Sequence, residues 1–203
     1  LGLPVIRTAH TEGQPIDVAA IEAALRADTQ HHIAAVMVVH TDTASGITSD
    51  LQAIRKAINS TGHPAHYVVD VVASLGAAPF DMDALGADVC LGSSQKGLMM
   101  PPGLGFVAVN AKAFAWSKAH AKPRFYWSWL ERKTDIQSAK FCGTPPLAHL
   151  AGLEVSLGLL KAEGLPAVYA RHQRLGGAVR AAVNCWARAG SIKLHCQDPN
   201  GFS

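Results

Sequence analysis

Charged side chains are scarce in this sequence of 203 residues. Asp, Glu, Lys and Arg together make up only 16% of it, whereas apolar residues make up 49%. This composition excludes a disordered chain and predicts a large buried core. The formal net charge is +3 with histidine neutral, and the lysines and arginines are scattered along the chain. Such a small, dispersed excess is typical of a solvated surface, so we expect no nucleic-acid partner.

Motifs that define several other classes of protein are also absent. The four cysteines form no C-x-x-C pair and no H-x-x-x-H motif occurs, so we expect reduced thiols and no metal site. No segment is long and apolar enough to span a membrane, and the chain opens with no signal-peptide pattern. We therefore expect a cytoplasmic protein without a membrane partner.

Helices and strands are expected to alternate through the first half of the chain. Asp17 is placed to cap a helix that runs to about residue 27, and Ser49 or Asp50 to cap another that runs to residue 58. The apolar, β-branched run 33–39 is typical of a parallel strand buried on both faces. This alternation of helices and strands predicts a layered α/β fold. Further strands are predicted at residues 4–6, 66–69, 88–91 and 105–109.

The second half is expected to be mostly helical. Residues 147–162 are apolar nearly all round, which predicts a buried helix, and residues 165–189 form an amphipathic pattern. Residues 192–196 are expected to begin a strand of a second domain. The length of 203 residues fits one large domain with an appendage.

Polar residues directly follow three of the predicted strands. His40 to Thr43 follow the strand at 33–39, Asp70 follows the strand at 66–69, and residues 92–96 follow the strand at 88–91. In open α/β sheets, ligands bind outside the carboxyl ends of the strands. The three clusters are therefore expected to line one pocket.

Lys96 is the most informative residue of these clusters. It is the only basic residue between Lys56 and Lys112, and it lies in a long apolar stretch. A lysine kept out of water has a lowered pKa, and its free amine is a nucleophile that can form a Schiff base. The alternative is a surface lysine whose stem alone is buried. The surroundings favour the first interpretation.

The segment Gly92–Gly103 around this lysine resembles the cofactor-lysine segment of class V (fold type I) pyridoxal-phosphate aminotransferases, in the serine–glyoxylate and alanine–glyoxylate branch. Segments His40–Gly46 and Val69–Gly76 belong to the same resemblance, which covers almost the whole chain. It implies the large domain of that fold, a three-layer sandwich around a mostly parallel sheet. It also implies transfer of an amino group from serine or alanine to glyoxylate or a similar 2-oxo acid.

The resemblance gives the two central residues their roles. Lys96 would carry the Schiff base with pyridoxal 5'-phosphate and move the substrate's α-proton. Asp70 would keep the nitrogen of the cofactor ring protonated, so that the ring accepts electrons. A carboxylate at the end of an apolar strand otherwise needs a cap or a salt bridge, which is the structural alternative for Asp70. His40 is expected to be a hydrogen-bonded structural histidine rather than an acid–base group.

Four further cofactor contacts are implied in the same way. Val72 would pack beneath the ring, or simply in the core. Thr43 would bind the ring hydroxyl, or stabilise a turn, and neighbouring Asp42 replaces a glutamate common in relatives. Gln95, with Ser94 beside it, would contact the phosphate. Thr144, before Pro145, would reach the phosphate of a neighbouring subunit in a homodimer, or cap a helix.

By the same resemblance the chain is a central part of such an enzyme. Residues 1–146 would form part of the cofactor-binding large domain, residues 147–189 helices that lead to the small domain, and residues 190–203 its start. The phosphate loop, the ring-stacking aromatic and the carboxylate-binding arginine have no counterpart here, so we expect the isolated chain to be inactive. Two alternatives stay open: another class V activity, such as an aminoethylphosphonate aminotransferase or a desulfurase-like lyase, and a non-catalytic dimerisation module.

Overall fold

The computed structural model describes residues 4–8 and 11–196, with a four-stranded sheet at its centre. The strands are β1 (Ala35–Val39), β2 (His66–Asp70), β3 (Val89–Ser93) and β4 (Gly105–Val109). They lie side by side in that order; β1, β2 and β3 are parallel, and β4 runs antiparallel to β3. The mostly parallel α/β sheet predicted from the sequence is confirmed.

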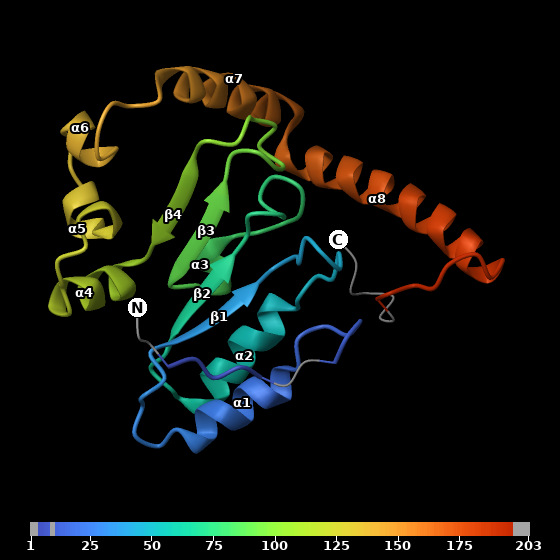
Figure 1. Ribbon diagram of the computed structural model, residues 1–203, viewed down its shortest axis with the longest axis horizontal. Helices are drawn as coiled ribbons and strands as arrows, with labels where there is room; N and C mark the ends of the chain where they lie inside the picture. The colour runs from blue at the N-terminus through green and yellow to red at the C-terminus, as the bar shows by residue number, and fades with distance from the viewer. Residues whose placement is uncertain (1–3, 9–10, 197–203) are drawn as a thin grey trace.

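The first two helices begin where the sequence predicts. Asp17 caps α1 and Asp50 caps α2; in each case Oδ1 accepts a hydrogen bond from a backbone N–H three residues on, at 3.1 and 2.8 Å. Helices α4 to α8 follow one another around the outside of the molecule (Figure 1). The helices are α1 (Val18–Ala27), α2 (Leu51–Thr61), α3 (Met82–Leu85), α4 (Ala111–Ala119), the 3-10 turn η1 (Phe125–Trp127), α5 (Trp129–Arg132), α6 (Gln137–Lys140), α7 (Leu147–Glu163) and α8 (Leu165–Arg188).

The main core lies between the sheet and the pair α1 and α2. Ile58 of α2 and Tyr67 and Val69 of β2 are fully buried in one cluster. Side chains alternate between the faces of a strand, so Tyr67 and Val69 point to the helices while Asp70 points to the opposite face. Each buried side chain of this size contributes roughly 1.5–3 kcal/mol. This layer therefore fixes the position of β2, and with it Asp70.

The face of the sheet opposite α1 and α2 is partly open. Met37 of β1 is 71% exposed, so the prediction that residues 33–39 are buried on both faces is wrong for the described part of the chain. The reason is that β1 is an edge strand and no described helix covers Met37. Residues 4–6 were also predicted as a strand; they pair with no strand among the described residues, and Val5 and Ile6 are exposed.

Helix α7 is less buried than its apolar sequence predicts. Leu147 is 71% exposed, whereas Ser156 and Leu160 are buried, because the helix contacts the rest of the chain along one stripe only. The predicted strand at 192–196 is wrong, since residues 191–196 form no strand and the residues beyond them lie outside the described part. None of the helices in the described ranges is long and apolar enough to cross a membrane.

Candidate functional site

The carboxyl ends of β1, β2 and β3 lie together at one edge of the sheet. The His40 N–H, just after β1, donates to the carbonyl of Asp70 at 2.8 Å. The Val71 N–H, just after β2, donates to the carbonyl of Leu91 in β3, also at 2.8 Å. The segments that follow these strands are therefore neighbours in space, as the sequence predicts.

Asp70 is the last residue of β2 and is half-buried. Its Oδ1 accepts a hydrogen bond from the Val72 N–H at 2.8 Å, which starts the turn over residues 71–78, here called the Asp70 turn. Within the part of the chain that the structure describes, Oδ2 has no hydrogen-bond partner. Because β2 ends at Asp70, Val72 lies in the turn and not on a strand face shared with Asp70. The carboxylate is thus held by one oxygen, with the other available to a ligand.

Lys96 lies in the connection from β3 to β4, residues 94–104, here called the lysine loop. Its side chain and that of Gln95 are exposed, so the expectation that Lys96 is kept out of water is wrong for the described residues. The physical reason is that the loop extends past the sheet edge immediately after buried Ser94. Among the described residues, no hydrogen bond or ion pair occupies the Lys96 amine.

Ser94 fixes the base of the lysine loop. It is fully buried, and its Oγ donates to the Pro101 carbonyl at 2.8 Å and accepts from the Leu104 N–H at 3.2 Å. Its own carbonyl accepts from the Met100 N–H at 3.1 Å. The sequence interpretation gave Ser94 only as a donor beside the lysine. Its observed contacts close the loop instead.

Two glycines bring the Asp70 turn and the lysine loop into backbone contact. A Cβ added to Gly97 would lie 2.3 Å from the carbonyl oxygen of Leu75. A Cβ added to Gly76, which has a φ of +80°, would lie 3.0 Å from the carbonyl carbon of Gly97. The sequence analysis missed this contact, although the two glycines were its signal. Only residues without side chains allow the two segments to approach so closely.

Ser93 belongs to the predicted polar cluster at residues 92–96, although no role of its own is predicted for it. It ends β3 on the same sheet face as Asp70, since Asp70 pairs in register with Leu91 and side chains alternate. Its Oγ is buried and has no hydrogen-bond partner among the described residues. A buried hydroxyl without a partner at this edge is a donor that a ligand would satisfy.

His40 and Thr43 follow β1. His40 is buried, its Nδ1 lies 2.8 Å from the Ser74 Oγ, and burial lowers the pKa of its imidazole. The predicted hydrogen bond of His40 is confirmed. Thr43 is exposed in a turn in which the Asp42 carboxylate accepts from the Ser45 N–H at 2.8 Å and from its hydroxyl at 2.6 Å. The Thr43 hydroxyl is thus exposed in the turn that follows β1.

Thr144 lies apart from these residues along the chain, between α6 and α7. It is exposed, and no hydrogen bond among the described residues joins it to the other candidate residues. The alternative that it caps a helix is wrong, because α7 begins at Leu147 and its N-terminus has no side-chain cap. A role for Thr144 in the site therefore remains a prediction.

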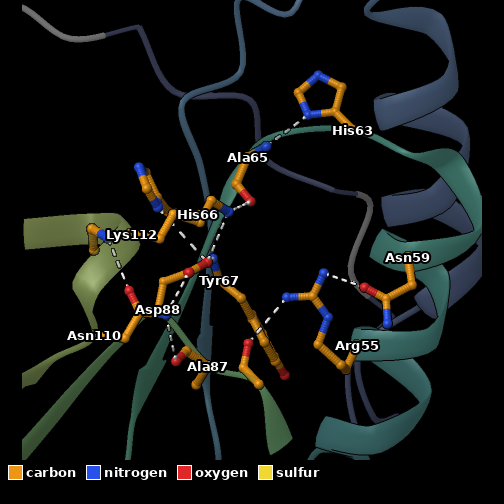
Figure 2. Close-up of polar contacts among 12 residues, drawn as sticks. Arg55, Asn59, His63, Ala65, His66, Tyr67, Ala87, Asp88, Asn110 and Lys112 are labelled. Carbon is orange, nitrogen blue, oxygen red and sulfur yellow. Dashed lines mark hydrogen bonds and ion pairs between the residues drawn. The ribbon is translucent and has the colours of Figure 1, made fainter. Parts of the chain in front are cut away.

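A separate polar cluster lies at the opposite end of the strands (Figure 2). Buried Asp88 accepts hydrogen bonds from the Tyr67 N–H at 2.8 Å, from the Asn110 amide at 2.8 Å and from the Lys112 amine at 3.3 Å. Burial opposes ionisation of Asp88, but these donors hold its pKa below the ordinary value. Lys112 is thus engaged in a structural contact, in contrast to the available amine of Lys96.

The described residues offer no arrangement for a metal ion. No group of three or more His, Cys, Asp or Glu side chains in the described ranges is placed to hold one. Cys90, Cys142, Cys185 and Cys196 are free thiols. The candidate site itself contains an amine, a carboxylate and several hydroxyl or amide groups.

Comparison with known proteins gives relatives of similar sequence. The serine–glyoxylate aminotransferase of Methylorubrum extorquens is 44% identical over 191 residues, which cover 92% of this chain and 48% of that protein. The L-aspartate–glyoxylate aminotransferase of Paracoccus denitrificans is 38% identical over 203 residues, 100% of this chain and 50% of the relative. The chain thus spans about half the length of the curated relatives it matches.

A solved structure and a family profile agree with these relatives. The crystal structure of pyridoxamine–pyruvate aminotransferase from Mesorhizobium loti superposes with a TM-score of 0.79 at 30% identity, covering 94% of this chain and 47% of that one. The profile of the family described as Aminotransferase class-V matches residues 2–187. Because the family profile matches nearly the whole chain and the sheet superposes on a solved aminotransferase, this chain belongs to the class V aminotransferases.

Proposed function

We propose that this chain carries the cofactor-lysine part of a pyridoxal-phosphate-dependent aminotransferase that moves an amino group from serine or alanine to glyoxylate or a similar 2-oxo acid. The observation that carries the proposal is the backbone contact between Gly76 and Gly97, which holds the turn after Asp70 against the loop that presents Lys96. The membership of the family and the glyoxylate-using relatives support the reaction class.

The residues at this edge fit the chemistry of pyridoxal phosphate. The cofactor has an aldehyde, a ring nitrogen, a ring hydroxyl and a phosphate. The available amine of Lys96 suits the aldehyde, and the unpartnered Oδ2 of Asp70 suits a protonated ring nitrogen. The unsatisfied hydroxyl of Ser93 and the exposed Thr43 and Gln95 side chains supply further donors. When bound, the cofactor would supply an electron sink for removal of the α-proton.

Five residues of the candidate site are each assigned a role in this proposal. Lys96 would hold the cofactor covalently and would move the proton at the substrate's α-carbon. Asp70 would keep the ring nitrogen protonated by its negative charge, and the Val72 N–H orients that carboxylate. Thr43 and Gln95 would bind the ring hydroxyl and the phosphate. The half-buried side chain of Val72 would pack against the ring.

The domain organisation and the oligomeric state are also proposed, on the basis of membership of the family. Residues 1–146 belong to the large domain, residues 147–189 lead to the small domain and residues 190–203 begin it. The active form is a homodimer in which Thr144 reaches the phosphate site of the neighbouring copy. The exposure of Thr144 leaves it available for such a contact.

An amino-transfer assay tests this function. The protein encoded by the complete reading frame is supplied with pyridoxal phosphate, and glycine formation from glyoxylate is measured with serine, alanine or aspartate as donor. We expect turnover with serine or alanine and less with aspartate. The variant Lys56→Ala, which changes an exposed lysine on α2, should match wild type. A protein that binds the cofactor yet transfers no amino group from any donor contradicts the proposal and favours a non-catalytic module.

A further inference from the structure

One buried polar side chain interrupts the apolar stripe of α7. Ser156 is only 5% exposed, whereas its neighbour Val155 is 65% exposed. A serine inside a helix commonly bonds the carbonyl four residues back in its own helix. Here the Ser156 Oγ donates instead to the carbonyl of Leu98, 58 residues away and two residues after Lys96. This bond joins α7 directly to the lysine loop.

Other residues on the same stripe of α7 contact the same loop. His149 lies two helical turns before Ser156, and its Nε2 lies 3.2 Å from the carbonyl of Pro102. Between them, a Cβ on Gly152 would lie 2.9 Å from the Cε atom of Met100. The lysine loop is therefore in contact with α7, and it is held separately by Ser94 at its base and by Gly76 of the Asp70 turn.

The Leu98 end of this contact is apolar. Leu98 is buried in a cluster with Leu160 of α7 and Val168 of α8, and Leu75 of the Asp70 turn packs against the same cluster. A buried carbonyl costs free energy when it has no donor. Without the Ser156 hydroxyl, the Leu98 carbonyl either loses its partner or moves toward water, and the backbone at Lys96 moves with it.

We infer that Ser156 is a positioning residue for Lys96: its bond to Leu98 fixes the loop that carries the Lys96 amine. This inference rests on the proposed function, because it assigns the geometry of the cofactor lysine. Ser156 does not touch the reacting atoms. It acts through the backbone between Lys96 and Leu98.

The test measures how fast Lys96 reacts, apart from turnover. The protein from the complete reading frame is freed of cofactor, mixed with pyridoxal phosphate and quenched with borohydride at increasing times. Peptide mass mapping gives the labelling rate at Lys96 and at exposed Lys56. In Ser156→Ala we expect Lys96 to label about two- to tenfold more slowly, the range that one hydrogen bond accounts for. Lys56 should label at the wild-type rate.

Two further variants separate positioning from a general packing role. Ser156→Thr keeps the hydroxyl and should restore the Lys96 rate. Val155→Ala changes the exposed neighbour on the same helix and should leave all rates unchanged. If Ser156→Ala does not fold, Ser156→Cys, with a weaker donor of similar size, gives the same comparison. Hydrogen exchange at the Met99 amide, which donates to the Lys96 carbonyl, should be faster in the slowed variant.

The outcomes distinguish this inference from the proposed function. No labelling of Lys96 in the wild-type protein contradicts the proposed function itself. Normal labelling of Lys96 in wild type and an equal rate in folded Ser156→Ala overturns only the role of Ser156. Equal slowing at Lys56 and Lys96 also overturns it, because a general loss of structure then explains the effect.

Discussion

Gly97 packs backbone to backbone against Gly76, so the loop that presents Lys96 and the turn that follows Asp70 form one unit. Gly97 leaves no room for a side chain, since the nearest atom is the backbone oxygen of Leu75 and not the end of a flexible side chain. The relative position of an amine and a carboxylate thus depends on two residues that have no functional group. The proposed catalysis would use both groups on one cofactor and would therefore depend on this contact.

Substitution of Gly97 tests that dependence. We expect Gly97→Ala to lower the free energy of unfolding by about 1–3 kcal/mol, the usual cost of forcing extra atoms into a packed site. The measurement is urea unfolding of the protein from the complete reading frame. Gly158→Ala is the matched control: it lies in α7 with no atom near its Cβ position and should raise stability by about 0.5–1 kcal/mol. Equal stability of wild type and Gly97→Ala would show that the contact is not close-packed.

The charge of Asp70 is expected to matter for the rate and not for the fold. In Asp70→Asn the amide oxygen still accepts from the Val72 N–H, so the turn stays formed. The lost charge should raise the activation free energy of α-proton transfer by several kcal/mol in order of magnitude. Pre-steady-state kinetics with a deuterated substrate would measure this change. Asp50→Asn removes a charge at the α2 cap and should leave the rate unchanged. Near-normal turnover in Asp70→Asn would make Asp70 a purely structural acid.

Asp88 gives an expectation for stability against pH. Its pKa is lowered in the folded protein, so the folded state binds its proton less readily than the unfolded state. The stabilisation is therefore present above the unfolded pKa, about 3.9, and is lost as pH falls through the lower folded value. We expect Asp88→Asn to cost about 1–3 kcal/mol at neutral pH, with a difference from wild type that shrinks as the pH falls below the unfolded pKa.

The control for the Asp88 experiment is Asp81, an aspartate that caps helix α3. Asp81 lies on the surface and accepts from the Ala84 N–H at 2.9 Å. Asp81→Asn keeps a capping side chain, so its effect on unfolding in urea should be small. A difference between Asp88→Asn and wild type that does not change with pH would show that ionisation of Asp88 contributes nothing to folding.

The local features of the fold were predictable from the sequence because their causes are local. Asp17 and Asp50 cap helices through bonds to residues three positions on, and β-branched runs mark β1 and β2. The meeting of the strand ends followed from the parallel order. These rules were enough to bring His40, Asp70 and the lysine loop to one edge.

The features that were not predictable depend on tertiary neighbours. Burial of α7 was overestimated because composition cannot tell which stripe of an apolar helix contacts the rest of the chain. Exposure of Lys96 depends on how far the loop extends beyond β3, which the sequence does not encode locally. The contact of Gly76 with Gly97 and the bond from Ser156 to Leu98 link residues far apart in the chain, and no periodicity signals them.

The size of the protein sets a further expectation. The chain spans about half the length of its curated relatives, so we expect the 203-residue chain by itself to show no amino transfer. Its exposed Trp127, Leu147 and Met37 should lead to self-association, which light scattering would detect.

The product of the complete reading frame should be a homodimer, and Thr144→Ala should weaken its cofactor binding. An active monomer of 203 residues would contradict two proposals: that this chain carries only part of the active site, and that two subunits share the site.

The covalent link to Lys96 is the most direct test of the account. The protein from the complete reading frame is loaded with pyridoxal phosphate, reduced with borohydride and digested, and the modified peptide is identified by mass. We expect the adduct on Lys96, and we expect Lys96→Ala to lose both the adduct and almost all amino transfer, because the covalent attachment and the base are removed together. An adduct on Lys112 or any other lysine of the wild-type protein would contradict the assignment.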